Sequence, residues 1–81
     1  MNQQEKILVQ VQQIVCEILK RDNIVLTFDT TSHDVSGWDS LTHMLIVAEV
    51  EKCFNIRINF RELMKISDVG VLVQTIEKKI K

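Results

Sequence analysis

The sequence predicts an all-α fold: a small four-helix bundle of three longer helices and a short third helix, with a long loop between helices 1 and 2. Apolar residues recur every three or four positions along most of the chain, which is the spacing of one helix face. The chain has no proline and only 2 glycines, the residues that most often separate short strands. Its 81 residues suit a single domain, which we expect to span 1–81.

The first helix is expected over residues 3–21, where apolar residues form one stripe and the opposite side is polar. The stripe consists of Ile7, Leu8, Val11, Ile14, Val15, Ile18 and Leu19. Residues 22–38 then form a connection that is unusually long for a structureless loop. Its apolar start is expected to pack across the bundle through Ile24, Val25, Leu26 and Phe28.

The second helix is expected to begin at Asp39 and Ser40 and to end near Phe54. The Asp39 carboxylate is suited to accept hydrogen bonds from the exposed amides of the first turn. Gly37 allows the backbone to turn tightly just before the helix. We therefore expect the Ser40 hydroxyl to be exposed.

The third helix is short and is expected over residues 60–65, because Asn59 and Glu62 have the spacing of a capping box. The last helix is expected to start after Ser67, with Asp68 in its first turn, where the helix dipole favours a negative charge.

The second helix has two apolar faces, although a helix in a small bundle needs only one. The face toward the core consists of Ile46, Val47, Val50, Cys53 and Phe54. The second face, which we call the apolar strip, consists of Leu41, Met44, Leu45 and Ala48. Either the helix is buried all round, or the strip is exposed and docks other proteins, which we favour.

The composition disfavours several classes of function. With 10 Lys and Arg against 11 Asp and Glu, the chain lacks the basic surface of nucleic-acid-binding proteins. We expect no membrane insertion, because no apolar run approaches the ~20 residues needed, and we see no secretory signal. Cys16 and Cys53 lack metal-site spacing with His33 or His43. We expect both to be buried thiols in a reducing cytoplasm, and the sequence leaves a disulfide between them as the alternative.

The segment from Gly37 to Leu41 reads Gly-Trp-Asp-Ser-Leu and resembles the Asp-Ser-Leu attachment motif of acyl and peptidyl carrier proteins. Residues 54–58 resemble the end of that family's second helix, and residues 66–69 resemble the entry to its last helix. The resemblance covers essentially the whole chain. The sequence is therefore identified as a member of the acyl carrier family, of the free-standing type.

The resemblance implies that Ser40, flanked by Asp39 and Leu41, carries a covalent 4'-phosphopantetheine arm. A phosphopantetheinyl transferase would supply the arm from coenzyme A with Mg²⁺, and the arm's thiol would hold an acyl group as a thioester. The protein would then be a monomeric substrate of other enzymes, namely a loading ligase and acyl-transfer or synthase enzymes, and no enzyme itself. We expect these partners to contact Leu41, Met44, Leu45, Ala48 and Glu51.

The second helix departs from carriers of fatty acid synthesis, whose corresponding helix is strongly acidic. Thr42, Leu45 and Lys52 stand at the matching positions, which leaves Glu49 and Glu51. We therefore expect a carrier of a specialised pathway, such as one for a polyketide, a nonribosomal peptide, or a modified sugar or lipid. Because the strip is apolar, salt should weaken partner binding only slightly.

Residues around Ser40 have more than one interpretation. Asp39 suits capping, and the resemblance also implies that it orients the metal or the modifying enzyme. His43 lies one turn after Ser40, so it can touch the arm, but we favour a partly buried helix residue. Trp38 is more consistent with a lid on the bundle than with a docking residue, and His33 is expected to be solvated.

Two other functions remain open from the residues alone. An aminoacyl or peptidyl carrier shares the fold and the arm and differs only in its loading enzyme. A non-carrier helical interaction domain would use the apolar strip alone and would keep its function in a Ser40→Ala variant. A serine enzyme is disfavoured, because the chain has no G-x-S-x-G motif and no evident base with an orienting partner.

Overall fold

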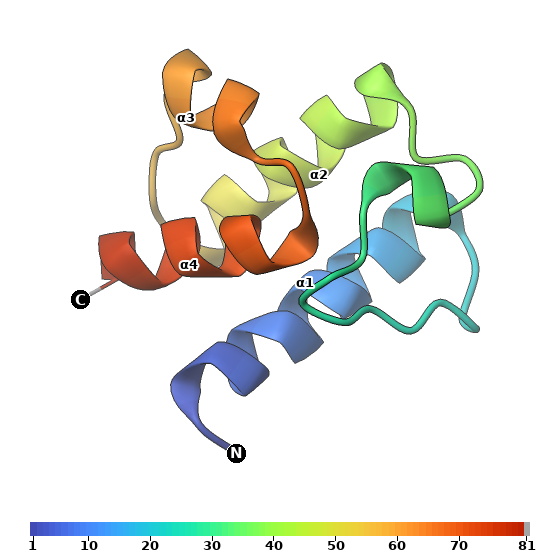
Figure 1. Ribbon diagram of the computed structural model, residues 1–81, viewed down its shortest axis with the longest axis horizontal. Coiled ribbons are helices and arrows are strands. Elements are labelled where there is room, and N and C mark those ends of the chain that lie inside the picture. Colours follow the sequence, from blue (N-terminus) through green and yellow to red (C-terminus); the bar gives the residue numbers. More distant parts are fainter. Residues whose placement is uncertain (81) are drawn as a thin grey trace.

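The computed structural model describes residues 1–80 and confirms the all-α fold. Its helices are α1 (Gln3–Leu19), α2 (Ser40–Phe54), α3 (Phe60–Lys65) and α4 (Val69–Ile80), with a short 3₁₀ helix, η1 (Ser32–Asp34), in the long loop. α1 packs against both α2 and α4, and α3 lies in the connection between α2 and α4 (Figure 1). Within residues 1–80, no helix combines the length and apolar character that a membrane crossing requires.

α1 begins at a complete capping box. The Asn2 side chain accepts a hydrogen bond from the Glu5 amide at 2.8 Å, and the Glu5 carboxylate accepts one from the Asn2 amide at 3.1 Å. The helix ends at Leu19, slightly before the expected end at residue 21, because Lys20 adopts a left-handed conformation with φ of 56°. A left-handed residue at this point turns the chain off the helix axis.

The core lies where α1, α2 and α4 meet. Its fully buried side chains are Ile7, Val11, Val15, Ile46, Val50, Val69, Leu72, Val73 and Ile76. Removing one such side chain from water contributes about 1.5–3 kcal/mol. The packing of these three helices is therefore the main source of stability, and it fixes the direction in which α2 presents its other face.

The long loop packs on the bundle through only part of its apolar start. Ile24 and Leu26 are buried, as expected, but Val25 is 76% exposed and Phe28 is 37% exposed. The expectation that all of them pack was wrong for these two: Val25 points away from its buried neighbours Ile24 and Leu26, as alternate residues of an extended segment do, and Phe28 lies in the turn that ends the segment. The Leu26 amide donates to the Gln12 side chain at 2.9 Å, which ties the segment to α1.

Two backbone hydrogen bonds join the loop to the start of α4. The Val69 amide donates to the Thr30 carbonyl and the Gly70 amide donates to the Phe28 carbonyl, each at 2.8 Å. Gly70 is needed here because a Cβ at this position would lie 2.7 Å from the Phe28 carbonyl oxygen. These two hydrogen bonds fix the position of the loop segment that precedes η1 and Ser40.

α4 begins one residue later than expected, which changes the role of Asp68. The helix starts at Val69, so Asp68 precedes it instead of lying in its first turn. Its carboxylate accepts a hydrogen bond from the Val71 amide at 2.9 Å. Asp68 therefore acts as the N-cap, which satisfies one of the free amides at the helix start.

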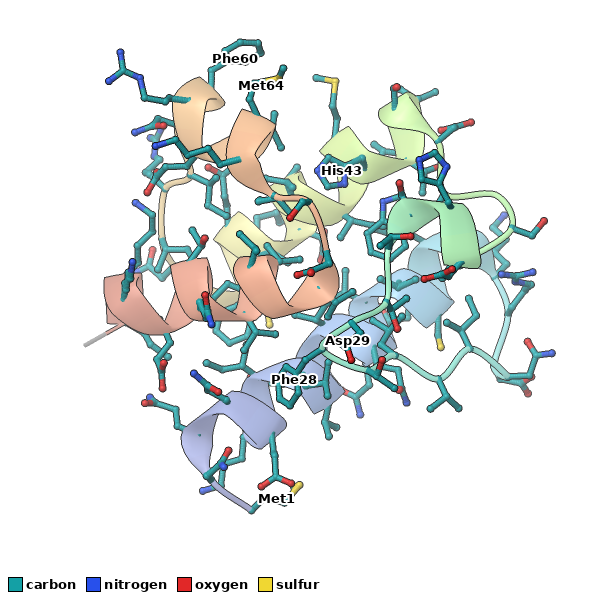
Figure 2. All side chains as sticks on the ribbon, in the orientation of Figure 1. Met1, Phe28, Asp29, His43, Phe60 and Met64 are labelled. Carbon is teal, nitrogen blue, oxygen red and sulfur yellow. The ribbon has the colours of Figure 1, made fainter. Side chains whose placement is uncertain are left out.

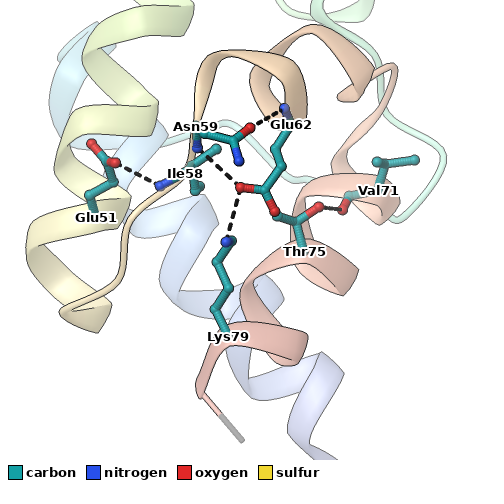
Figure 3. A network of polar contacts seen from close by, with 7 residues as sticks. All are labelled: Glu51, Ile58, Asn59, Glu62, Val71, Thr75 and Lys79. Carbon is teal, nitrogen blue, oxygen red and sulfur yellow. Dashed lines mark hydrogen bonds and ion pairs between the residues drawn. The ribbon is translucent and has the colours of Figure 1, made fainter.

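Polar contacts fix α3 and the connection that precedes it to α4 on one side and to α2 on the other (Figure 3). Asn59 and Glu62 form the expected capping box. The Glu62 carboxylate also pairs with the Lys79 ammonium of α4 at 2.9 Å, and this contact lowers the pKa of Glu62 below its ordinary value. On the other side, the Glu51 carboxylate of α2 accepts a hydrogen bond from the Ile58 amide at 2.8 Å.

The two cysteines differ from the expectation that both are buried. Cys16 is half-buried, and its thiol lies 3.6 Å from the Ile24 carbonyl oxygen. Cys53 is exposed. On the helical wheel Cys53 lies at the margin of the buried stripe of α2, and the core does not extend to that margin. Both thiols are free.

Candidate functional site

The turn that leads into α2 presents Ser40 to solvent. Gly37 has a φ of 93°, a left-handed conformation that glycine adopts without steric cost. The Trp38 amide donates to the Val35 carbonyl at 3.2 Å, and the Asp39 amide donates to the Gly37 carbonyl at 3.1 Å. Ser40 follows as the first residue of the helix, and it is exposed. The expectations for Gly37 and for the exposure of Ser40 are confirmed.

Asp39 caps α2, as the sequence predicts. Its carboxylate accepts a hydrogen bond from the Thr42 amide at 2.8 Å, and its carbonyl accepts one from the His43 amide at 2.8 Å. The hydrogen bond from Thr42 holds the pKa of the Asp39 carboxyl below its ordinary value, so this carboxylate is ionised at neutral pH. The remaining amides of the first turn stay available to an anion beside Ser40.

Trp38 and His43 form a pair beneath the start of α2. The indole Nε1–H donates to His43 Nδ1 at 3.1 Å, and the rings stack with centroids 6.1 Å apart. Trp38 is only 8% exposed, which confirms the interpretation of this residue as a lid on the bundle. His43 is half-buried, and burial lowers its pKa, so Nδ1 remains an acceptor at neutral pH.

A groove of about 520 Å³ opens beside Ser40, between η1, α2 and α3. Its lining residues are Ser32, His33, Trp38, Asp39, Ser40, His43, Met44, Phe60, Leu63, Met64 and Ile66. Figure 2 shows His43 between α2 and α3, with Phe60 and Met64 on the outer side of α3. The groove is therefore mostly apolar, with polar groups near the start of α2. His33 is exposed on η1, as expected for a solvated residue.

The apolar strip on α2 is exposed, which excludes a helix buried all round. Leu41 is 69% exposed, Met44 is 60% exposed and Leu45 is 50% exposed; Ala48 is exposed as well. The strip occupies the side of α2 away from α1 and begins one residue after Ser40. Any protein that contacts the strip therefore also lies beside Ser40.

α3 adds two exposed apolar side chains that the sequence analysis missed. Phe60 is 74% exposed and Met64 is 70% exposed, and both line the groove. Their spacing of four residues on a short helix is the signal that could have revealed them. We use the name α2–α3 apolar surface for Leu41, Met44, Leu45, Phe60 and Met64.

Glu51 has a role in the fold that the sequence analysis did not consider. It is half-buried, and its carboxylate accepts a hydrogen bond from the Ile58 amide, which lies in the connection between α2 and α3. This bond accounts for an acidic residue at this position. Contact between Glu51 and a partner stays a prediction.

Comparisons with known proteins agree with this geometry. Residues 9–76 match the family model described as phosphopantetheine attachment site. The chain is 38% identical to an acyl carrier protein of an Exiguobacterium species, over 94% of this chain and 96% of that one. It is 35% identical to the acyl carrier protein of Thermotoga maritima over 99% of both chains.

The chain belongs to the acyl carrier protein family. A solution structure of the holo acyl carrier protein from Geobacter metallireducens matches this carrier with a TM-score of 0.84 and 34% identity. The match covers 90% of this chain and 84% of that one. The family implies a covalently attached 4'-phosphopantetheine, and the residues present fit it. An exposed hydroxyl stands at a helix start, above a groove whose volume of about 520 Å³ can accommodate part of an arm.

Proposed function

We propose that this protein carries an acyl group as a thioester on a 4'-phosphopantetheine arm attached to Ser40. The observation that carries the proposal is the position of Ser40. It is the exposed first residue of α2, it follows a tight glycine turn, and it lies at the edge of the groove between α2 and α3.

The surroundings of Ser40 suit a phosphodiester. The amides of the first helical turn and the positive end of the helix dipole favour an anion at this point. The Asp39 carboxylate accepts a hydrogen bond from one of those amides, that of Thr42, and so stabilises the first turn of the helix. We also propose that Asp39 and Leu41, which flank Ser40, are recognised by the transferase. The bound arm supplies a terminal thiol for the thioester.

The partners follow from this role. A phosphopantetheinyl transferase attaches the arm from coenzyme A, a ligase loads the acyl group, and acyl-transfer or synthase enzymes consume it. The protein is then a substrate of these enzymes and catalyses no reaction itself. We propose that residues 1–81 act as one monomeric carrier unit in the cytoplasm. The free thiols of Cys16 and Cys53 are consistent with a reducing compartment.

The partner enzymes are proposed to dock on the apolar strip (Leu41, Met44, Leu45 and Ala48) and on Glu51. Flexible side chains such as Met44 adapt to more than one partner surface. Lys52 and Glu49, which lie 4.0 Å apart, carry opposite charges and so add no net charge to this side of the helix. An apolar docking face supports the proposal of a carrier dedicated to a specialised pathway.

An aminoacyl or peptidyl carrier is the alternative of the same fold. Its arm and its attachment serine would be the same, and only the loading enzyme would differ. A non-carrier interaction domain is less consistent with the match of residues 9–76 to the phosphopantetheine attachment family.

The test is the intact mass of the protein after incubation with coenzyme A, Mg²⁺ and a broad-specificity phosphopantetheinyl transferase. We expect the wild type to gain the mass of one phosphopantetheine and Ser40→Ala to gain none. Ser36→Ala is the matched control, since Ser36 is also exposed and lies in the same turn. It should be modified like the wild type. No gain by well-folded wild type would support the interaction domain instead.

A further inference from the structure

The hydrogen bond from Trp38 fixes which nitrogen of His43 carries the imidazole proton. The indole Nε1–H can only donate, and it donates to His43 Nδ1 at 3.1 Å. A neutral imidazole has one protonated nitrogen and one acceptor nitrogen, so the proton of His43 lies on Nε2. Because burial lowers the pKa of His43, the ring is neutral at neutral pH and keeps this tautomer.

The Nε2–H group of His43 is a donor in contact with solvent. Within residues 1–80, the side-chain hydrogen bond of His43 is the one at Nδ1, and every buried side-chain nitrogen or oxygen has a partner. Nε2 is therefore accessible, although the ring as a whole is half-buried. His43 lines the groove that Ser40 also lines, and it lines a second cavity of about 30 Å³ toward α4.

Ser40 lies three residues before His43 on the same helix. Residues with this spacing are neighbours, with about 5–6 Å between their Cβ atoms. Helical side chains also lean toward the N-terminus of their helix, so the imidazole of His43 leans toward the turn that begins at Ser40. A group attached to the Ser40 hydroxyl therefore starts within reach of this ring.

Few other side chains suit an anion at Ser40. Among the described residues that line the groove, none is Lys or Arg, and the neighbouring Asp39 carboxylate is itself ionised. That carboxylate also accepts the Thr42 amide, one of the donors of the first turn. An imidazole Nε2–H suits a phosphate oxygen, whereas the lone pair of the other tautomer would repel it.

We propose that the Nε2–H of His43 donates a hydrogen bond to the phosphodiester that joins the arm to Ser40, and that Trp38 holds His43 in the tautomer that can donate. The inference rests on the proposed attachment of the arm to Ser40. His43 is then a positioning residue that orients the first bonds of the arm, and Trp38 acts through it. His33, which is exposed on η1 and lines the same groove, provides a comparison within the same molecule.

The test is NMR of protein with isotopically labelled histidine, before and after the transferase attaches the arm and mass spectrometry confirms the attachment. In the apo protein, Nε2 of His43 should carry the proton, and this proton should exchange rapidly with water. In the holo protein, a charge-assisted hydrogen bond should slow the exchange by about tenfold or more. The imidazole protons of His33 should show no such change.

Three results would overturn the inference while the proposed function stands. A proton on Nδ1 of His43 in the apo protein would contradict the tautomer. Equally slow exchange in the apo and holo proteins would place the donor in the inner cavity, which Asp68 also lines, instead of on the arm. Equally rapid exchange in both would show that the arm does not accept this proton. Wild-type protein that gains no arm would instead contradict the proposed function, and the inference with it.

Variants identify the phosphodiester as the acceptor. In holo His43→Leu, the phosphorus resonance of the arm should move toward its position in urea-unfolded holo protein, because the donor is lost. His43→Gln retains a side-chain N–H donor and should stay closer to the wild type. His33→Leu is the matched control and should leave the resonance unchanged. An unchanged phosphorus resonance in folded His43→Leu would contradict the proposal.

Trp38→Phe examines the other half of the proposal, and it decides the role of Trp38 even if His43→Leu does not fold. This variant keeps an aromatic ring but removes the indole donor. Both neutral tautomers of His43 should then appear in the apo protein, and the slowing of Nε2–H exchange on attachment of the arm should be smaller than in the wild type. A single Nε2–H tautomer in Trp38→Phe would show that Trp38 does not select it.

Discussion

The contact between the long loop and α4 predicts that Gly70→Ala destabilises the protein, although alanine is the better helix former. Alanine in place of glycine contributes at most about 1 kcal/mol of helix stability. At this position, however, the new Cβ would lie 2.7 Å from the Phe28 carbonyl oxygen, which is a backbone atom and cannot rotate away. The segment from Phe28 to Thr30 must therefore move.

That movement weakens two backbone hydrogen bonds, from Gly70 to Phe28 and from Val69 to Thr30. Each contributes about 0.5–1.5 kcal/mol, and overpacking costs about 1–3 kcal/mol. With the low end of each range, and against a gain of about 1 kcal/mol, the expected net loss is at least about 1 kcal/mol. For a domain of this size that lowers Tm by about 4–8 °C.

Urea denaturation and thermal melting by circular dichroism measure this change. The matched control is the pair of variants Gln74→Gly and Gln74→Ala, at an exposed position in the same helix. There alanine should be the more stable of the two by about 1 kcal/mol. If Gly70→Ala were as stable as the wild type or more stable, the loop would not be anchored as the structure indicates.

Three further outcomes are expected. Burial lowers the pKa of His43, so the unfolded state binds a proton at this imidazole more readily than the folded state does. The neutral imidazole therefore favours the folded state above about pH 6.5, and this contribution to stability is lost as the pH falls through the pKa of His43 in the folded state. The free energy of unfolding, measured with urea, should therefore change less between about pH 7 and pH 5 in His43→Gln than in the wild type. Asp39, Asp68 and His33, which line pockets together with His43, are unchanged in this variant. The double variant L41S/M44S should change stability by no more than about 0.5 kcal/mol. It should nevertheless raise the KM of the transferase about tenfold or more, while Gln13→Ser on the exposed side of α1 should leave it unchanged. Raising salt from about 50 to 200 mM should change that KM less than about twofold, because the docking face is apolar; a steep dependence would contradict the apolar docking proposal.

Local patterns were enough to predict the helices and the exposed strip. The apolar faces predicted α1 and α2, the spacing of Asn59 and Glu62 predicted α3, and Ser67 with Asp68 predicted the start of α4. The second apolar face of α2 predicted an exposed strip, because a small bundle buries only one face of each helix in its core. The uncertainty at the start of α4 arose because both Ser67 and Asp68 can cap a helix, and only tertiary structure decides between them.

Features that depend on the path of the loop could not be predicted. The Trp38 indole, which follows the left-handed turn at Gly37, donates a hydrogen bond to His43 of α2, and helical periodicity does not predict such a contact. The groove beside Ser40 likewise requires the placement of α3, which is set by contacts of Glu62 with Lys79 and of Glu51 with Ile58. These contacts join one element of the chain to another, and the periodicity within a single helix gives no information about them.

The central claim is that Ser40 carries the arm, and the most direct measurement is the position of the added mass. Fragmentation mass spectrometry of the modified protein separates Ser40 from Ser32, Ser36 and Ser67, the other serines of the chain. We predict that every fragment that retains the phosphopantetheine contains Ser40, and that fragments with only the other serines are unmodified. Phosphopantetheine on any other serine, or a modified Ser40→Ala protein, would contradict this account.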